Sequence, residues 1–301
     1  MTPGMQTQTW TIRSALEWTQ AYLERKEDPN PRRSAQWLLS ETTGLSRIEL
    51  YTHYDRPLSL GERAILRECV ARRAAKEPLQ YITGEVGFRH IVLKVRPGVL
   101  IPRPETEVLV SEALALLSPW AQARAVLVAD LCTGSGAIAC SIAHECPQAR
   151  VVATDIAPEA VALACENAAL LGLQERIEVL QSDLGTEVAK CLLGSFDLVA
   201  SNPPYIPTAL LAGLADEVKD FEPSLALDGG EDGLEPFRRM LPWALKALSP
   251  SGAAVFELHE DCLEKAASLA QEAGFASTRI VRDLAGKPRI LVACLAAKQI
   301  E

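Results

Sequence analysis

The chain has 301 residues, enough for two domains, and its 48% hydrophobic and 23% charged residues are ordinary for a soluble protein with a well-filled core. It contains no run of eighteen apolar residues, so we expect no membrane span. The formal net charge of −9 falls on residues 87–301, because basic and acidic residues nearly balance over residues 1–86. Binding to a phosphate backbone needs clustered positive charge, so this distribution counts against a DNA substrate, and we expect no direct nucleic-acid partner.

The N-terminal segment and the cysteines both indicate a cytoplasmic protein. Residues 1–10 are polar and have neither the basic nor the apolar region of a secretory signal. The eight cysteines are scattered, without a C-x-x-C pair or a nearby histidine. They therefore predict a reducing compartment, no disulfide framework and no metal site.

Residues 11–77 have the pattern of a small helical bundle. One helix is predicted to begin near Thr11, and a second has Pro31 near its first turn and ends by Gly44. Two capping boxes predict two further helix starts. These are Ser46-Arg47-Ile48-Glu49 and Ser59-Leu60-Gly61-Glu62.

From Gln80 to Val99 the pattern changes to short strand-like pieces broken by glycine and proline, which predicts a hairpin or linker. A helix is expected from Glu105 to about Leu117. The chain therefore divides into a helical domain (1–79), a hairpin or linker (80–100) and a main domain (101–301).

Strands and helices alternate over the rest of the chain. Apolar, β-branched runs predict strands, and helical segments separate most of them. The predicted strands cover residues 126–131, 151–155, 177–180, 196–200, 253–257, 280–281 and 290–293. This order predicts an α/β fold with a mainly parallel, Rossmann-like sheet covered by helices on both faces.

A glycine-containing loop follows the first of these strands and leads directly into a helix. Its residues are Cys132, Thr133, Gly134, Ser135 and Gly136. The glycines allow a sharp turn and close approach of a ligand, and the helix N-terminus offers free N–H groups. The dinucleotide fingerprint G-x-G-x-x-G is met only in its G/A variant, by Ala139, so a Rossmann dehydrogenase stays open at this point.

Two carboxylates are predicted at the same edge of the sheet. Asp155 ends the second strand and could accept hydrogen bonds from the two ribose hydroxyls of an adenosine. Asp183 follows the third strand and could accept from an adenine amine, with Leu184 packing on the ring. Both lie where ligands bind in open α/β sheets.

The sequence Asn202-Pro203-Pro204-Tyr205 follows the fourth strand directly. The two prolines stiffen the loop and leave nearby carbonyls without a competing N–H. The Asn202 side-chain oxygen and the Pro203 carbonyl could each accept one N–H of a planar amide-type nitrogen, and Tyr205 could pack on its flat face. Two acceptors would hold this weak nucleophile toward a sulfonium methyl group without a general base.

Together these motifs resemble the peptide chain release factor glutamine methyltransferases over nearly the whole chain. Further segments carry the resemblance, among them Arg103-Pro104-Glu105-Thr106-Glu107 and Phe221-Glu222-Pro223. The others are residues 81–84, 229–234 and 283–286.

The resemblance implies transfer of a methyl group from S-adenosyl-L-methionine, leaving S-adenosyl-L-homocysteine. The acceptor it implies is the glutamine of the Gly-Gly-Gln motif in class 1 release factors, which the helical domain and hairpin help to dock. It also implies cofactor contacts from residues 132–136, Asp155, Asp183, Leu184 and Asn202, and a glutamine site at residues 202–205. We expect a monomer.

Two departures and three alternatives accompany this interpretation. Cys132 stands where such loops often have glycine, which is tolerable if its φ is negative. His259 stands where the family often has glycine, and we expect it to be a surface residue rather than a base. The alternatives are an adenine-N6 DNA methyltransferase, a glutamine methyltransferase of a ribosomal protein, and a nucleotide-binding module without catalysis.

Overall fold

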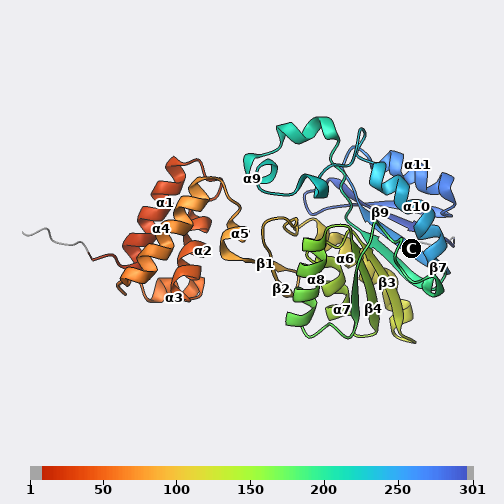
Figure 1. The fold of residues 1–301 in the computed structure, drawn as a ribbon, viewed down its shortest axis with the longest axis horizontal. Helices are drawn as coiled ribbons and strands as arrows, with labels where there is room; N and C mark the ends of the chain where they lie inside the picture. Colours follow the sequence, from red (N-terminus) through yellow and green to blue (C-terminus); the bar gives the residue numbers. More distant parts are fainter. Residues whose placement is uncertain (1–8, 297–301) are drawn as a thin grey trace, which may run out of the picture. The chain divides into compact units, whose positions relative to one another are not determined.

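The structure is a computed structural model that describes residues 9–296 and divides the chain into two compact units (Figure 1). The first unit runs to Gly84 and includes Asp216–Phe221. The second holds Glu85–Ala215 and the chain from Glu222 onward. The expected cytoplasmic location rests partly on the N-terminal segment, residues 1–10. Residues 1–8 of that segment lie outside the described part of the chain. No helix within residues 9–296 is long and apolar enough to cross a bilayer.

The first unit is the predicted helical bundle. Its helices are α1 (Ile12–Arg25), α2 (Pro31–Thr43), α3 (Arg47–Thr52), α4 (Leu60–Ala74) and α5 (Leu79–Thr83). Both capping boxes are present: the side chains of Ser46 and Ser59 each accept a hydrogen bond from the N–H three residues later. Gly44 adopts a left-handed conformation that ends α2, as its sequence position predicts.

The strand-like pattern expected from Gln80 is wrong at its start. Residues 79–83 form α5, which begins after Pro78 and ends at Gly84 in a left-handed conformation, with Tyr81 and Ile82 buried. The predicted hairpin begins only afterwards, as antiparallel strands β1 (Glu85–Phe88) and β2 (Ile91–Lys94). Five residues are too few for helical periodicity to show in the sequence.

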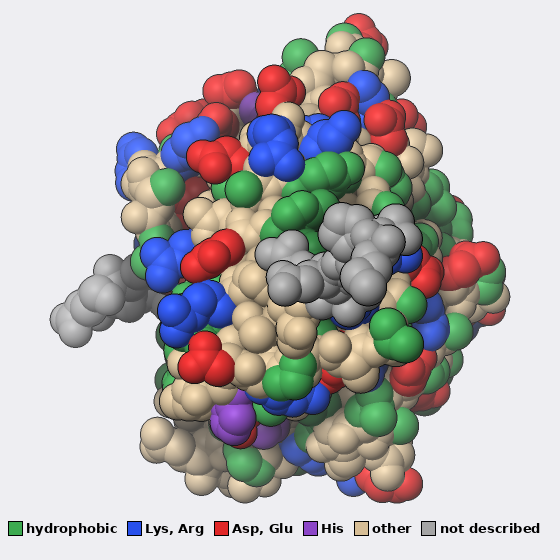
Figure 2. Space-filling model, turned by 90° about the vertical axis from the view of Figure 1, so that its left-hand side faces the viewer, with side chains coloured by type: hydrophobic (Ala, Val, Ile, Leu, Met, Phe, Trp, Pro, Cys, Tyr) green, Lys and Arg blue, Asp and Glu red, His purple; other side chains and the backbone are tan. Residues whose placement is uncertain are grey.

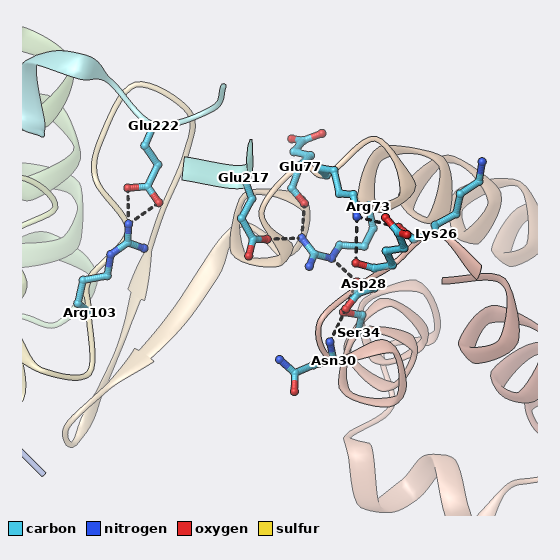
Figure 3. Close-up of polar contacts among 11 residues, drawn as sticks. Lys26, Asp28, Asn30, Ser34, Arg73, Glu77, Arg103, Glu217 and Glu222 are labelled. Carbon is cyan, nitrogen blue, oxygen red and sulfur yellow. Dashed lines mark hydrogen bonds and ion pairs between the residues drawn. The ribbon is translucent and has the colours of Figure 1, made fainter. Parts of the chain in front are cut away.

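A buried arginine ties a distant segment into the first unit. Nε of Arg73 lies 2.6 Å from Oδ2 of Asp28, and its Nη1 lies 2.8 Å from Oε2 of Glu217 (Figure 3). Glu217 belongs to α9 (Asp216–Lys219), 144 residues after Arg73. Arg73 and Asp28 are both buried, so removing either one leaves an uncompensated buried charge, which costs about 3–5 kcal/mol, whereas Glu217 is partly exposed. The contact explains why this short segment belongs to the first unit.

The second unit contains a seven-stranded sheet in the order β5-β4-β3-β6-β7-β9-β8. The strands are β3 (Val126–Leu131), β4 (Ala149–Asp155), β5 (Ile177–Gln181), β6 (Phe196–Ser201), β7 (Leu248–Glu257), β8 (Ser277–Arg282) and β9 (Pro288–Cys294). The first five are parallel, and β9 and β8 join antiparallel as a closing hairpin. The predicted α/β fold is confirmed.

Helices cover both faces of this sheet. The core on one face involves α6 (Thr106–Ala121), α7 (Ala137–Glu145) and α8 (Pro158–Leu170). The core on the other face involves α10 (Glu235–Ala247) and α11 (Leu263–Ala273). The strand order reverses beside β3, which has β4 on one side and β6 on the other. The carboxyl ends of these strands, where such folds bind ligands, carry the candidate site.

Candidate active site

The loop after β3 has the close backbone packing that its glycines predict. Gly134 and Gly136 have φ values of +58° and +81°. A Cβ on Gly136 would lie 3.2 Å from the Cβ of Ala164 in α8, so a side chain there would crowd that helix. Asp155, at the end of β4, accepts the N–H of Gly134 at 2.8 Å. Asp155 therefore fastens the loop in addition to lining the cavity beside it.

Cys132 does not meet the condition under which we expected it to be tolerable. Its φ is +58°, a left-handed conformation that is strained for a residue with a Cβ. Burial raises the pKa of its thiol, and the neighbouring Asp155 and Asp130 carboxylates add to the effect. The side chain is therefore a protonated thiol and not a nucleophile.

Asp130 lies beneath the same loop and is fully buried. Its Oδ2 accepts the hydroxyl of Thr133 at 2.6 Å and the N–H of Ala139 at 3.1 Å, which joins the loop to the first turn of α7. Burial raises its pKa to about 7. Its Oδ1 has no hydrogen-bond partner among residues 9–296.

An open cavity lies at this edge of the sheet, with about 800 Å³ of empty space that includes the solvent at its mouth. Its wall is mainly apolar with a few polar side chains, as is usual for a small-molecule site. Of the predicted site residues it is lined by Cys132, Thr133, Gly134, Ser135, Asp155, Asn202 and Pro204. The glycine loop, the free N–H groups of α7 and the acceptor Asp155 fit an adenosine-bearing cofactor such as S-adenosylmethionine.

Five predicted residues are not in the lining of this cavity: Gly136, Asp183, Leu184, Pro203 and Tyr205. The carboxylate of Asp183 forms an ion pair with Arg239 of α10 at 2.6 Å. Leu184 packs at the border of the core under α10 and α11. An adenine amine would therefore have to share Asp183 with this arginine.

Glycines on a later segment hold the loop of Asn202. A Cβ on Gly229 would lie 2.7 Å from the Cα of Tyr205, which leaves no room for a side chain. The N–H of Gly229 also donates to the carbonyl of Ile206 at 2.8 Å, and the N–H of Ile206 donates to Leu227 at 2.9 Å. These contacts explain the glycine-rich segment after residue 228 that the sequence singled out.

A buried carboxylate behind the loop was missed in the sequence. Glu257 ends β7 and is fully buried; its Oε2 accepts the hydroxyl of Thr106 at 2.6 Å and its Oε1 accepts that of Tyr205 at 3.2 Å. The hydroxyl of Thr106 also lies 3.1 Å from Nδ2 of Asn202. Burial raises the pKa of Glu257, and burial together with the Glu257 charge raises that of Tyr205. The strand-end rule that identified Asp155 also applies to Glu257 and could have found it.

One wall of the cavity comes from the segment after Glu222. Pro223, Leu225 and Ala226 line the cavity. Both carboxylate oxygens of Glu222 accept hydrogen bonds from Nη2 of Arg103, at 2.8 and 2.7 Å (Figure 3).

His259, expected at the surface, has a side chain that is 23% exposed, and its ring centroid lies 6.4 Å from that of Tyr205.

Comparisons with known proteins agree with these observations. Residues 14–84 match the family model described as "PrmC N-terminal domain", and residues 109–211 match "Methyltransferase small domain". The release factor glutamine methyltransferase of Geobacter sulfurreducens is 42% identical over 94% of this chain and 96% of its own length. That of Moorella thermoacetica is 40% identical over 94% and 98%. A crystal structure of the hMettl16 catalytic domain has a similar fold, with a TM-score of 0.57 at 16% identity over 77% of this chain and 83% of that one.

Proposed function

The chain belongs to the release factor glutamine methyltransferases, which makes it a methyl-transferring enzyme, and from this membership we propose its reaction. S-adenosylmethionine donates a methyl group to the side-chain amide nitrogen of the glutamine in the Gly-Gly-Gln motif of class 1 peptide chain release factors. One observation carries the proposal: Asn202, which opens the Asn-Pro-Pro-Tyr loop, lines the same cavity as Asp155 and the glycine loop. A methyl donor and an amide acceptor can therefore meet at one edge of the sheet.

The cofactor site is assigned to the loop of residues 132–136, to Asp155 and to Asp183 with Leu184. S-adenosylmethionine supplies an electrophilic methyl group when it is bound. The N–H groups at the start of α7 suit its carboxylate, and Asp155 has lone pairs left to accept from ribose hydroxyls. The mainly apolar lining suits the rest of the molecule.

The acceptor site is assigned to residues 202–205. The side-chain oxygen of Asn202 and the backbone carbonyl of Pro203 each accept one N–H of the substrate amide. This holds a weakly nucleophilic nitrogen in place and stabilises the positive charge that develops on it. Tyr205 packs against the flat amide. The nitrogen would need no base before it reacts, since its proton becomes acidic only as the new N–C bond forms. The S–CH₃ bond would break in the same step to leave S-adenosylhomocysteine, and the proton would be released to solvent, toward which the cavity is open.

Nucleic acid is disfavoured as the substrate. A DNA adenine methyltransferase would need basic side chains around the site that receives the extruded base. Residues 87–301, which contain the candidate site, carry the negative net charge of the chain, and on the face drawn in Figure 2 Lys and Arg side chains lie among Asp and Glu side chains. The names of the relatives favour release factors over a ribosomal protein as well.

The first unit is proposed to dock the release factor. It carries an open groove whose lining includes Arg32, Arg33 and Arg47 and no acidic side chain. Trp37 lies in the same groove, with the guanidinium of Arg47 5.4 Å from its ring centroid. Such a groove suits an acidic segment of a protein. A cytoplasmic, monomeric enzyme is also proposed, and the eight free thiols support the reducing compartment.

The test is methyl transfer from labelled S-adenosylmethionine to a purified release factor or to duplex DNA. We expect label in the release factor only, and none after the glutamine of its Gly-Gly-Gln motif is replaced by alanine. Label in DNA but not in the release factor would refute the proposed reaction. Label that survives the glutamine replacement would refute the assigned acceptor. Asn202→Ala should lower turnover by about 100-fold or more, because it removes one of two aligned acceptors.

A further inference from the structure

The orientation of the Asn202 side chain decides whether the acceptor site can work. A side-chain amide has an oxygen that accepts at one end and an NH₂ group that donates at the other. Only the oxygen can receive an N–H of a substrate glutamine. A reversed amide would place donor against donor. The inference below rests on the proposed function, because it concerns how that acceptor is set.

We propose that Thr106 and Glu257 are positioning residues that fix the Asn202 amide with its oxygen toward the methyl acceptor. The three side chains form one line of hydrogen bonds. Oε2 of Glu257 lies 2.6 Å from Oγ1 of Thr106, which lies 3.1 Å from Nδ2 of Asn202. Thr106 comes from the start of α6 and Glu257 from the end of β7, 151 residues apart in the chain.

The direction of these hydrogen bonds follows from donor chemistry when Glu257 is ionised. An ionised carboxylate can only accept, so the single hydroxyl hydrogen of Thr106 is directed at Glu257. The hydroxyl oxygen then has only lone pairs to offer Asn202. The end of the amide that faces Thr106 must therefore be the NH₂ group. The oxygen Oδ1 is left for the substrate, and no residue within 9–296 donates to it in the structure.

The same carboxylate also reaches the other end of the loop. Its Oε1 accepts the hydroxyl of Tyr205 at 3.2 Å, so one buried group orders both polar side chains of the Asn-Pro-Pro-Tyr sequence. Glu257 is fully buried and Thr106 is 3% exposed. Little bulk water can therefore replace a lost partner, and a broken link leaves a polar atom unsatisfied.

Protonation of Glu257 would remove the fixed donor direction of the hydrogen bonds that run from Asn202 through Thr106 to Glu257. A neutral carboxyl group can donate to Thr106, whose hydroxyl hydrogen is then free to turn to Asn202 and reverse its amide. The charged and titratable groups that act most strongly on Glu257 include Arg289, Glu105 and Tyr205; Arg289 favours the ionised form and Glu105 opposes it. Burial raises the pKa of Glu257 overall. Activity should therefore be present above this pKa and fall below it, at a higher pH than for an exposed carboxylate.

The first experiment compares three variants in single-turnover methylation of a release factor. Thr106→Val keeps the shape and removes the hydroxyl that fixes the Asn202 amide, so the rate should fall by about tenfold to 100-fold, as expected when a group that stabilises the transition state is no longer held in place. The affinity for S-adenosylmethionine should stay within about threefold. Thr106→Ser should restore the rate to within about threefold of the wild type. Thr19→Val is the matched control, since Thr19 is also buried but its hydroxyl has no partner in the described chain.

A Thr106→Val rate equal to the wild type, or a Thr106→Ser rate as low as that of Thr106→Val, would overturn the positioning role. If Thr106→Val does not fold, the pH profile of Glu257→Gln decides. Glutamine cannot ionise, so the acidic limb of the wild-type profile should vanish in this variant. Persistence of that limb would overturn the inference. If the wild-type protein methylates no release factor at all, the proposed function fails instead, and the two failures are distinct.

Discussion

Arg103 and Glu222 are 119 residues apart in the chain, yet Nη2 of Arg103 hydrogen-bonds both carboxylate oxygens of Glu222. The Glu222 side chain is 2% exposed, and the residues that follow it form one wall of the cavity. Arg103→Ala should therefore loosen this wall, weakening S-adenosylmethionine binding by about tenfold and lowering the free energy of unfolding by about 3 kcal/mol. Calorimetric titration and chemical denaturation measure the two effects.

An exposed ion pair of the same unit is the control for this prediction. Arg96 and Glu166 lie 2.7 Å apart, as closely as Arg103 and Glu222, but their side chains are 44% and 43% exposed. Arg96→Ala should change stability by less than about 1 kcal/mol, because water screens the pair. Equal losses in both variants would show that burial does not decide the effect.

Most regular elements were predictable from the sequence, with the short helix α5 as an exception, and contacts between distant side chains were not. The predicted first strand, residues 126–131, has the bounds of β3, because a buried strand shows as a continuous apolar run. Both capping boxes were predictable as well, because their interacting residues are only three positions apart in the sequence. No local pattern joins Thr106 to Glu257 or Arg73 to Glu217. The sequence singled out the segments around Thr106 and Glu222 only through resemblance, without a role for either residue.

The strain at Cys132 predicts an unusual order of stabilities. Alanine at this position keeps a Cβ in the left-handed conformation, whereas glycine adopts it without cost. Both substitutions remove the buried sulfur. Cys132→Gly should therefore be more stable than Cys132→Ala by about 1 kcal/mol, the reverse of the usual preference for alanine. Thermal and urea denaturation measure the difference, and an Ala variant more stable than the Gly variant would contradict it.

Gly229 should not tolerate even a methyl group. A Cβ there would lie 2.7 Å from the Cα of Tyr205, a backbone atom that cannot move without shifting the acceptor loop. Gly229→Ala should lower methyl transfer by about 100-fold or more, since small misplacements of reacting groups carry effects of this size. The control is Gly213→Ala, because a Cβ on Gly213 meets nothing within 4 Å. Normal turnover by the Gly229 variant would show that the loop position is not critical.

Variants of Asp183 and Arg239 can distinguish two roles for the Asp183 carboxylate: binding the adenine amine, or only pairing with Arg239. If Asp183 accepts an adenine amine, Asp183→Ala should weaken S-adenosylmethionine binding by about tenfold, while Arg239→Ala leaves it unchanged or tighter, because the carboxylate is then no longer shared. If Asp183 acts only through the ion pair, the two variants should weaken binding equally. Titration with S-adenosylmethionine and with a methyl donor analogue lacking the adenine amine distinguishes these outcomes.

The groove on the first unit predicts a defect in docking without a defect in chemistry. Arg32 and Arg33 are exposed in the first turn of α2, where the helix N-terminus favours negative charge. Replacing both with glutamate should therefore leave the fold at least as stable while repelling an acidic segment. We expect the KM for a release factor to rise about tenfold and kcat to stay within about twofold, because the rim charges act on encounter. Arg13→Glu, at an exposed arginine of α1 outside the groove, should leave both unchanged. An unchanged KM in the double variant would exclude the groove from docking, and a fall in kcat alone would place its effect on the reaction rather than on binding.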